Sequence, residues 1–264
     1  MSTTELSPRP GSAPGLNKVL AHASMELRLL LRNGEQLLLA LVIPLGLLLL
    51  LGGTRLGDRL PLGEFTVAVR RIDLVVPRVL ALAVLSSSFT SLAIATGFER
   101  RYGVIKRLGA SPLSRTGLLA GKITAVLVVQ LLQFAVLCGT ALALGWQPHP
   151  GAATVIGVVA TVVTGTAAFA SLGLLMAGTL RAEATLAAAN LVYLLLLVGG
   201  AVLAPVSEYP PAMQSVVKLI PSAALSSSMA TATVDGMMPW AGATALALWA
   251  GVLGYLVSKT FRWD

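Results

Sequence analysis

Long apolar runs separated by short polar segments dominate the chain from residue 36 onward. A helix needs about 20 largely apolar residues to cross the hydrocarbon core of a bilayer. Because a spanning helix satisfies its own backbone hydrogen bonds, runs of this length predict helices. We predict an all-α polytopic membrane protein with six transmembrane helices, at about residues 36–53, 74–98, 118–145, 152–180, 185–204 and 239–258.

The segment before the first run, residues 16–33, has the period of an amphipathic helix. Its apolar residues recur at steps of three and four, with Lys18, His22, Glu26, Arg28 and Arg32 largely off that stripe. This pattern predicts a helix lying in the membrane interface; the alternative is the polar start of a long first helix. Residues 1–15, rich in Ser, Pro and Gly, predict a disordered cytoplasmic tail, and residues 16–264 form a single transmembrane domain.

Residues 205–235 are semi-apolar but broken by prolines, and they are too polar to span a membrane. Pro221 divides this segment into two short pieces. Because irregular backbone is not tolerated against lipid, we predict an external re-entrant helical segment buried against the protein. The alternative is a surface loop carrying an interfacial helix.

Composition narrows the class of protein further. Hydrophobic residues make up 56% of the 264 residues and charged residues 11%, against roughly 25% charged in soluble domains. Soluble enzymes and nucleic-acid-binding proteins are therefore excluded, and the net charge of +8 indicates cytoplasmic loops and lipid contact. Placing both termini in the cytoplasm of a bacterial inner membrane puts most Lys and Arg inside. Four arginines between the first two spans leave the orientation of residues 53–73 open.

Charged groups that would perform chemistry are missing from the middle of the predicted spans. Residues 123–180 contain no Asp, Glu, Lys or Arg, whereas ion-coupled carriers and intramembrane enzymes commonly need such a group. His22 and His149 lie far apart and have no neighbouring ligand cluster, so we predict no metal site and no catalytic residue. The string Gly117–Lys122 lacks the spacing and hydroxyl of a phosphate-binding loop, so any ATP is hydrolysed on another polypeptide.

The polar groups inside the spans are neutral. Such side chains either bond neighbouring helices or line a cavity. Our candidates for cavity lining, all within predicted spans, are Phe89, Thr90, Gln133, Asn190 and Tyr193.

The most informative stretch is residues 98–122, FERRYGVIKRLGASPLSRTGLLAGK, between the second and third spans. A charged helix is followed by a turn at Gly109–Pro112, and the chain re-enters the membrane after Gly121 and Lys122. The stretch resembles the cytoplasmic loop of permease subunits of ABC-2-type ATP-binding-cassette exporters. The matching positions are Glu99, Arg100, Gly103, Lys106, Arg107, Leu108, Ser111, Pro112, Leu113, Ser114, Gly121 and Lys122.

The resemblance implies a permease subunit that performs no catalysis and binds no cofactor itself. Two ABC ATPase subunits, carrying ATP and Mg, would bind a coupling loop made of Glu99, Arg100, Arg101, Gly103, Lys106, Arg107, Ser111 and Pro112. A second permease chain, identical or paralogous, would pair with this one across spans one and five, surrounded by membrane lipids and without nucleic acid. The implied cargo is a hydrophobic or amphipathic, drug- or antibiotic-like solute.

Three alternatives stay open at this stage. The same mechanism can export a lipid or a lipid-linked glycan. From other classes, the chain can be an ion-coupled carrier or a membrane assembly protein without transport activity. Identifying a stoichiometric ATPase partner discriminates the exporter from the last two.

Overall fold

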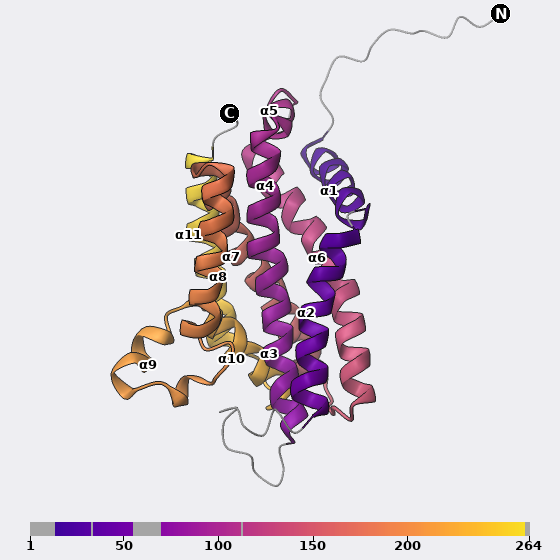
Figure 1. The fold of residues 1–264 in the computed structure, drawn as a ribbon, viewed down its shortest axis with the longest axis vertical. Helices are drawn as coiled ribbons and strands as arrows, with labels where there is room; N and C mark the ends of the chain where they lie inside the picture. Colours follow the sequence, from indigo (N-terminus) through magenta and orange to yellow (C-terminus); the bar gives the residue numbers. More distant parts are fainter. Residues whose placement is uncertain (1–13, 33, 55–69, 112, 262–264) are drawn as a thin grey trace, which may run out of the picture.

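The computed structural model describes residues 14–32, 34–54, 70–111 and 113–261. Nearly all of the predicted tail at residues 1–15, the loop at residues 55–69 and Pro112 lie outside the described residues. Within the described ranges every regular element is helical, in agreement with the all-α prediction (Figure 1).

The described elements are long helices with shorter helical pieces between them. In chain order they are α1 (Gly15–Arg32), α2 (Gly34–Gly53), α3 (Arg71–Leu85), the π-helical turn η2 (Ser86–Ser91), α4 (Leu92–Arg101), α5 (Val104–Gly109), α6 (Arg115–Ala143), α7 (Ala152–Thr179), α8 (Ala182–Gly199), the 3-10 turn η3 (Val206–Glu208), α9 (Pro211–Val217), α10 (Pro221–Thr233) and α11 (Trp240–Thr260).

Among the described residues, five helical segments are long and apolar enough to cross a membrane: Arg71–Arg101, Arg115–Ala143, Ala152–Thr179, Ala182–Gly199 and Trp240–Thr260. They correspond to predicted spans two to six. The predicted first span coincides with α2, whose described apolar part, Ala40–Gly53, is shorter than a full span. The first predicted span, and with it the total of six, therefore stays a prediction.

The predicted end of the fifth span is wrong. Instead of continuing to residue 204, α8 ends at Gly199. Consecutive glycines weaken the helix here, and Ala201 takes a left-handed conformation with φ of 54°, which a helix cannot continue through. The following Pro205 keeps the chain extended.

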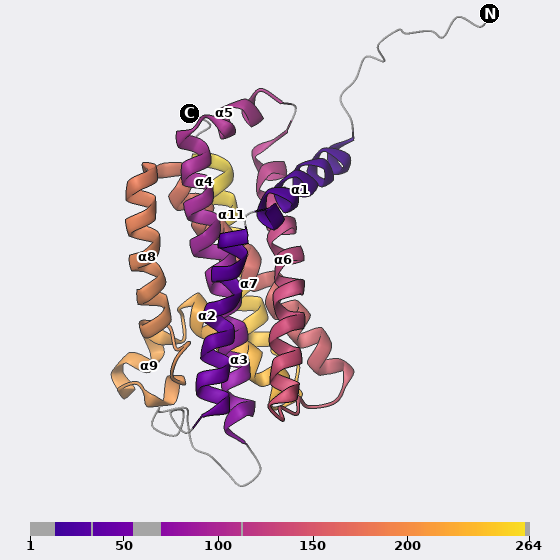
Figure 2. The same cartoon turned by 45° about the vertical axis from the view of Figure 1, so that its right-hand side comes forward.

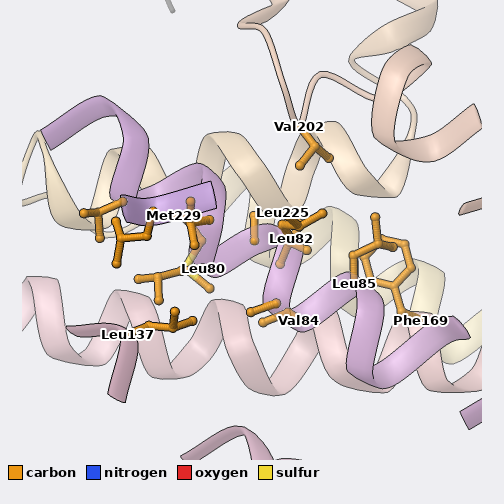
Figure 3. Close-up of a cluster of buried hydrophobic side chains, with 14 of the residues drawn as sticks. Leu80, Leu82, Val84, Leu85, Leu137, Phe169, Val202, Leu225 and Met229 are labelled. Carbon is orange, nitrogen blue, oxygen red and sulfur yellow. The ribbon is translucent and has the colours of Figure 1, made fainter. Parts of the chain in front are cut away.

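The segment α3–η2–α4 forms the centre of the bundle, and α7, α10 and α6 pack around it. Figure 3 shows the core layer where side chains from α3, α7 and α10 meet. Close packing depends on small residues: a Cβ at Gly173 of α7 would lie 2.8 Å from the carbonyl oxygen of Phe89. The two backbones therefore touch at the π turn.

A polar network holds the π turn in place. Gln130 of α6 donates from Nε2 to Ser87 Oγ at 2.8 Å and accepts from Thr166 Oγ1 of α7 at 2.7 Å. All three side chains are buried. Because an unpaired polar group is costly in an apolar interior, this network fixes the relative positions of η2, α6 and α7.

The predicted break at Pro221 coincides with the start of α10, with α9 on the other side of a short turn. Most of α10 is buried, and it packs against α7, α3 and α11. In Figure 1, α9 and α10 lie at the opposite end of the bundle from α5.

Candidate functional site

The loop between α4 and α6 is built around one left-handed residue. Gly103 has φ of 73°, a conformation that favours glycine, and it turns the chain from the end of α4 into α5. Ile105 is fully buried and anchors α5 to the bundle. Ser114 then caps α6 by accepting a hydrogen bond from the amide of Gly117 at 3.0 Å. The loop is thus a defined structure that projects beyond the bundle (Figures 1 and 2).

The predicted coupling residues separate into two groups. Lys106, Arg107 and Ser111 are exposed on α5 and its following turn, and Tyr102 beside them is 69% exposed. This surface is basic and open to a partner.

Arg100 and Arg101 instead connect helices. Arg100 Nη1 donates to the carbonyl oxygens of Ala177, at 2.8 Å, and Leu180, at 3.1 Å, which end α7. Arg101 forms an ion pair with Glu183 in the first turn of α8. These two arginines tie the end of α4 to α7 and α8.

Glu99 belongs to a buried ion cluster that joins three helices. Lys122 Nζ of α6 lies 2.8 Å from Glu26 Oε1 of α1 and 2.7 Å from Glu99 Oε2 of α4. The Lys122 side chain is 0% exposed, that of Glu26 7% and that of Glu99 22%. Buried charges need such partners because the protein interior solvates them poorly. The ammonium group therefore links α1 to α4 directly beneath the exposed loop.

The sequence analysis found no charged residue in the middle of a predicted span, but it did not predict that Lys122 and Glu26 would be buried. Lys122 lies near the start of its helix, as the eighth residue of α6, and Glu26 reaches it from α1, which packs beside α6. The position differs from the mid-membrane charges on which the ion-coupled alternative depends. Among the described residues, no group of three or more His, Cys, Asp or Glu is arranged to hold a metal ion.

The inner face of α1 carries polar residues, and its outer face is apolar. His22, Ala23 and Glu26 are buried against α6, whereas Leu16 is 69% and Leu20 51% exposed. The sequence analysis identified the apolar stripe and placed His22 and Glu26 off it, without a partner helix. Their i, i+4 spacing places both side chains on one face of the helix and could have indicated a polar contact surface.

His22 fits against a glycine of α6. A Cβ at Gly121 would lie 2.4 Å from His22 Cδ2, so only glycine allows this approach. Burial lowers the pKa of the His22 imidazole; Glu26 opposes that shift and Lys122 adds to it. His22 Nε2 lies 3.5 Å from Glu26 Oε1, so the imidazole packs directly beside the ion cluster.

A cavity of about 260 Å³ opens beside the cluster. Its walls come from α1, η2, α4, α5 and α6 and include Glu26, Glu99, Lys122, Ser87 and Tyr102. It extends from the ion cluster towards the polar network of the π turn.

The five cavity candidates from the sequence are not brought together. Phe89 is fully buried in the core, and Gln133 Nε2 donates to the carbonyl of Ala40 at 2.6 Å. The Thr90 hydroxyl is buried and has no hydrogen-bond partner among the described residues. Asn190 is exposed on α8 and Tyr193 is half-buried. None of them lines this cavity or the larger one described below.

The comparison with protein families agrees with this architecture. The model of the ABC-2 family transporter proteins matches residues 60–258, which is most of the chain. The chain therefore belongs to the ABC-2 transporter family and is a multi-pass membrane component of an ABC-type transporter. None of the curated proteins compared with the chain matches it.

Proposed function

We propose that this chain is the permease subunit of an ABC exporter that is driven by two separate ATPase subunits, which bind ATP and Mg. The observation that carries the proposal is the ion cluster of Glu26, Lys122 and Glu99, which joins α1, α4 and α6 immediately behind the exposed basic surface of α5. An ATPase bound to α5 and α1 would therefore move helices that the ion cluster already connects, namely α1, α4 and α6.

The mechanism is a rigid-body relay. Movement of α5 on ATP-driven closure passes to α4, because only Tyr102 and Gly103 separate the two helices. The ion cluster passes the same movement to α1 and α6, and the arginine contacts of α4 pass it to α7 and α8. Packed helices respond by switching between discrete arrangements, which would convert inward access into outward access.

A second permease chain, identical or paralogous, completes the translocation pathway in this proposal. The outer face of α8 exposes Leu191, Leu194 and Leu195 together with Asn190. A polar amide facing lipid is unfavourable, whereas Asn side chains commonly bond across helix interfaces. A partner chain covering α8 and α2 would supply that environment.

The cargo in this proposal is a hydrophobic or amphipathic solute resembling a drug or antibiotic. The walls of such a pathway would be apolar with scattered hydroxyl and amide groups, which is typical of small-molecule sites. Export of a lipid or lipid-linked glycan by the same relay is the alternative. The setting is a bacterial inner membrane, with both termini and α5 in the cytoplasm and residues 205–235 re-entrant from outside.

Reversing charge on the exposed face of α5 tests the ATPase contact. We expect Arg107→Glu to abolish co-purification of a stoichiometric ATPase from native membranes, because an exposed basic residue is replaced at the proposed docking surface. Partners are identified by mass spectrometry after mild detergent extraction. Lys259→Glu, an exposed cation outside α5, is the matched control and should retain the ATPase. Failure of the unmodified chain to retain any ATPase in several detergents would overturn the proposal.

Thiol labelling tests the orientation. In a Cys138→Ser background, Ser207→Cys should react with an impermeant thiol reagent added to intact cells. Ser207 is exposed in η3, the turn before α9, and α9 lies at the end of the bundle opposite α5 (Figure 1). Ser111→Cys, exposed in the loop after α5, should react only after permeabilisation. The reverse pattern would invert the proposed topology.

A further inference from the structure

A second, larger cavity lies at the end of the bundle opposite α5. Its volume is about 570 Å³, within the range of roughly 300–1,000 Å³ found for small-molecule sites. Five parts of the chain enclose it: the start of α3, the segment from the end of α8 to η3, the turn between α9 and α10, α10 itself, and the first turns of α11. Its lining includes Arg78, Lys218, Ser226, Ser227, Thr231 and Leu74.

Among the described residues that line this cavity, the charged ones are Arg78 and Lys218, two cations from different elements. Arg78 Nη1 donates to the carbonyl of Leu74 at 3.0 Å, which holds the guanidinium at the wall. Serine and threonine hydroxyls of α10 add hydrogen-bonding groups, and most of the remaining wall is apolar.

The walls are fixed by close contacts that leave little freedom to collapse. A Cβ at Gly242 of α11 would lie 1.9 Å from Ser228 Oγ, so α10 and α11 touch at this point. On the opposite wall, Ala201 is held in its left-handed conformation and its amide donates to Tyr209 Oη at 3.3 Å. A non-glycine residue held in this region is strained and requires such support. The packing of the walls therefore keeps the cavity open.

We propose that this cavity binds the anionic headgroup of an amphiphile, with a phosphate or carboxylate between Arg78 and Lys218. The guanidinium is suited to recognise such oxyanions in a forked geometry, and the ammonium group adds a second positive charge. The apolar wall accommodates the part of the molecule that follows the headgroup. This inference deepens the proposed function by assigning a ligand class, but the binding itself needs no ATPase.

Binding is tested with the full chain purified in a neutral detergent. The probes are short-chain phosphatidylglycerol, which is anionic, and phosphatidylcholine of the same chain length, with retention measured by native mass spectrometry. We expect tighter binding of phosphatidylglycerol and a loss of about tenfold in Lys218→Glu, because one of two cations is reversed. Lys218→Gln should give a smaller loss, and Lys259→Glu, at the other end of α11, should bind like the unmodified chain.

Equal affinity for the two lipids, or unchanged phosphatidylglycerol binding in Lys218→Glu, would overturn the assignment. To determine whether the ligand is a bilayer lipid, the lipids that remain bound to the protein after extraction are identified. Anionic lipid carried by the unmodified chain and absent from Lys218→Glu identifies a bilayer lipid as the ligand, whereas a chain extracted without lipid excludes a tightly held bilayer lipid. Loss of the ATPase in the co-purification test would leave this result untouched, so the two proposals fail independently.

Discussion

Replacement of the buried ammonium group, Lys122→Met, is expected to destabilise the protein by about 3–5 kcal/mol, the usual cost of removing one partner from a buried ion pair. The reason is that Glu26 and Glu99 would then face each other without their shared counter-charge. Methionine keeps the length and the apolar contacts of the lysine stem, so the change isolates the charge. The expected result is a large fall in the yield of monodisperse protein and in its midpoint of thermal unfolding in detergent.

The triple variant Glu26→Gln, Lys122→Met, Glu99→Gln tests whether the unpaired carboxylates cause the loss of stability. It removes all three charges, so most of the stability should return even though the ion pairs are gone. Lys259→Met, an exposed lysine, should behave like the unmodified chain. If Lys122→Met is as stable as the unmodified chain, the cluster does not hold α1 and α4 together. If the triple variant folds but no longer exports cargo, the ion pairs themselves contribute to the relay.

The long helices could be predicted from sequence because their signal is local. Residues 123–180 lack charged side chains, and lipid exposure demands helices of a known length. The end of α8 was missed because Gly199, Gly200 and Ala201 are all compatible with an apolar span in composition. What ends the helix is the backbone conformation at Ala201, which residue type alone does not disclose.

The ion cluster was missed because its members are far apart in the chain. Glu26 is 96 residues from Lys122, and in a helical pattern a polar residue is normally assigned to the solvated face. Sequence reasoning therefore found Glu99 and Lys122 as parts of a loop motif without finding the partner that joins them to α1. The pairing depends on α1 crossing α6, a tertiary contact that no local period encodes.

For the candidate cavity residues, the sequence showed that they lie within spans but not which way their side chains point. Phe89 and Gln133 were selected because they lie within spans, but helix packing turned them into the core. The cations of the larger cavity were not among the candidates. Arg78 lies in the first turns of the predicted span at residues 74–98, and Lys218 belongs to the short turn between α9 and α10. Side-chain direction in three dimensions decides which polar residues share a cavity.

The second large effect is expected from Gly121→Val, which should detach α1 from α6 without changing any charge. A Cβ at this position would lie 2.4 Å from His22 Cδ2 and 3.4 Å from His22 Cβ, so the imidazole and the helix that carries it must move. Overpacking of this kind costs roughly 1–3 kcal/mol. We expect the bundle to remain folded while export is lost, because the path from α1 to α6 is broken.

The measurement is the thiol reactivity of a cysteine on α1, which reports whether α1 is docked against α6. Ala23 is 6% exposed in the contact with α6, so Ala23→Cys in a Cys138→Ser background should be protected from thiol reagents and become reactive when Gly121→Val is added. Gly139→Val is the matched control, because it places the same side chain on the same helix where nothing lies within 4 Å of the new Cβ. Protection of the cysteine in both variants would show that Gly121 does not control the docking of α1. Reactivity in the Gly121 variant alone, together with loss of export, would identify the α1–α6 contact as the step through which the ATPase drives transport.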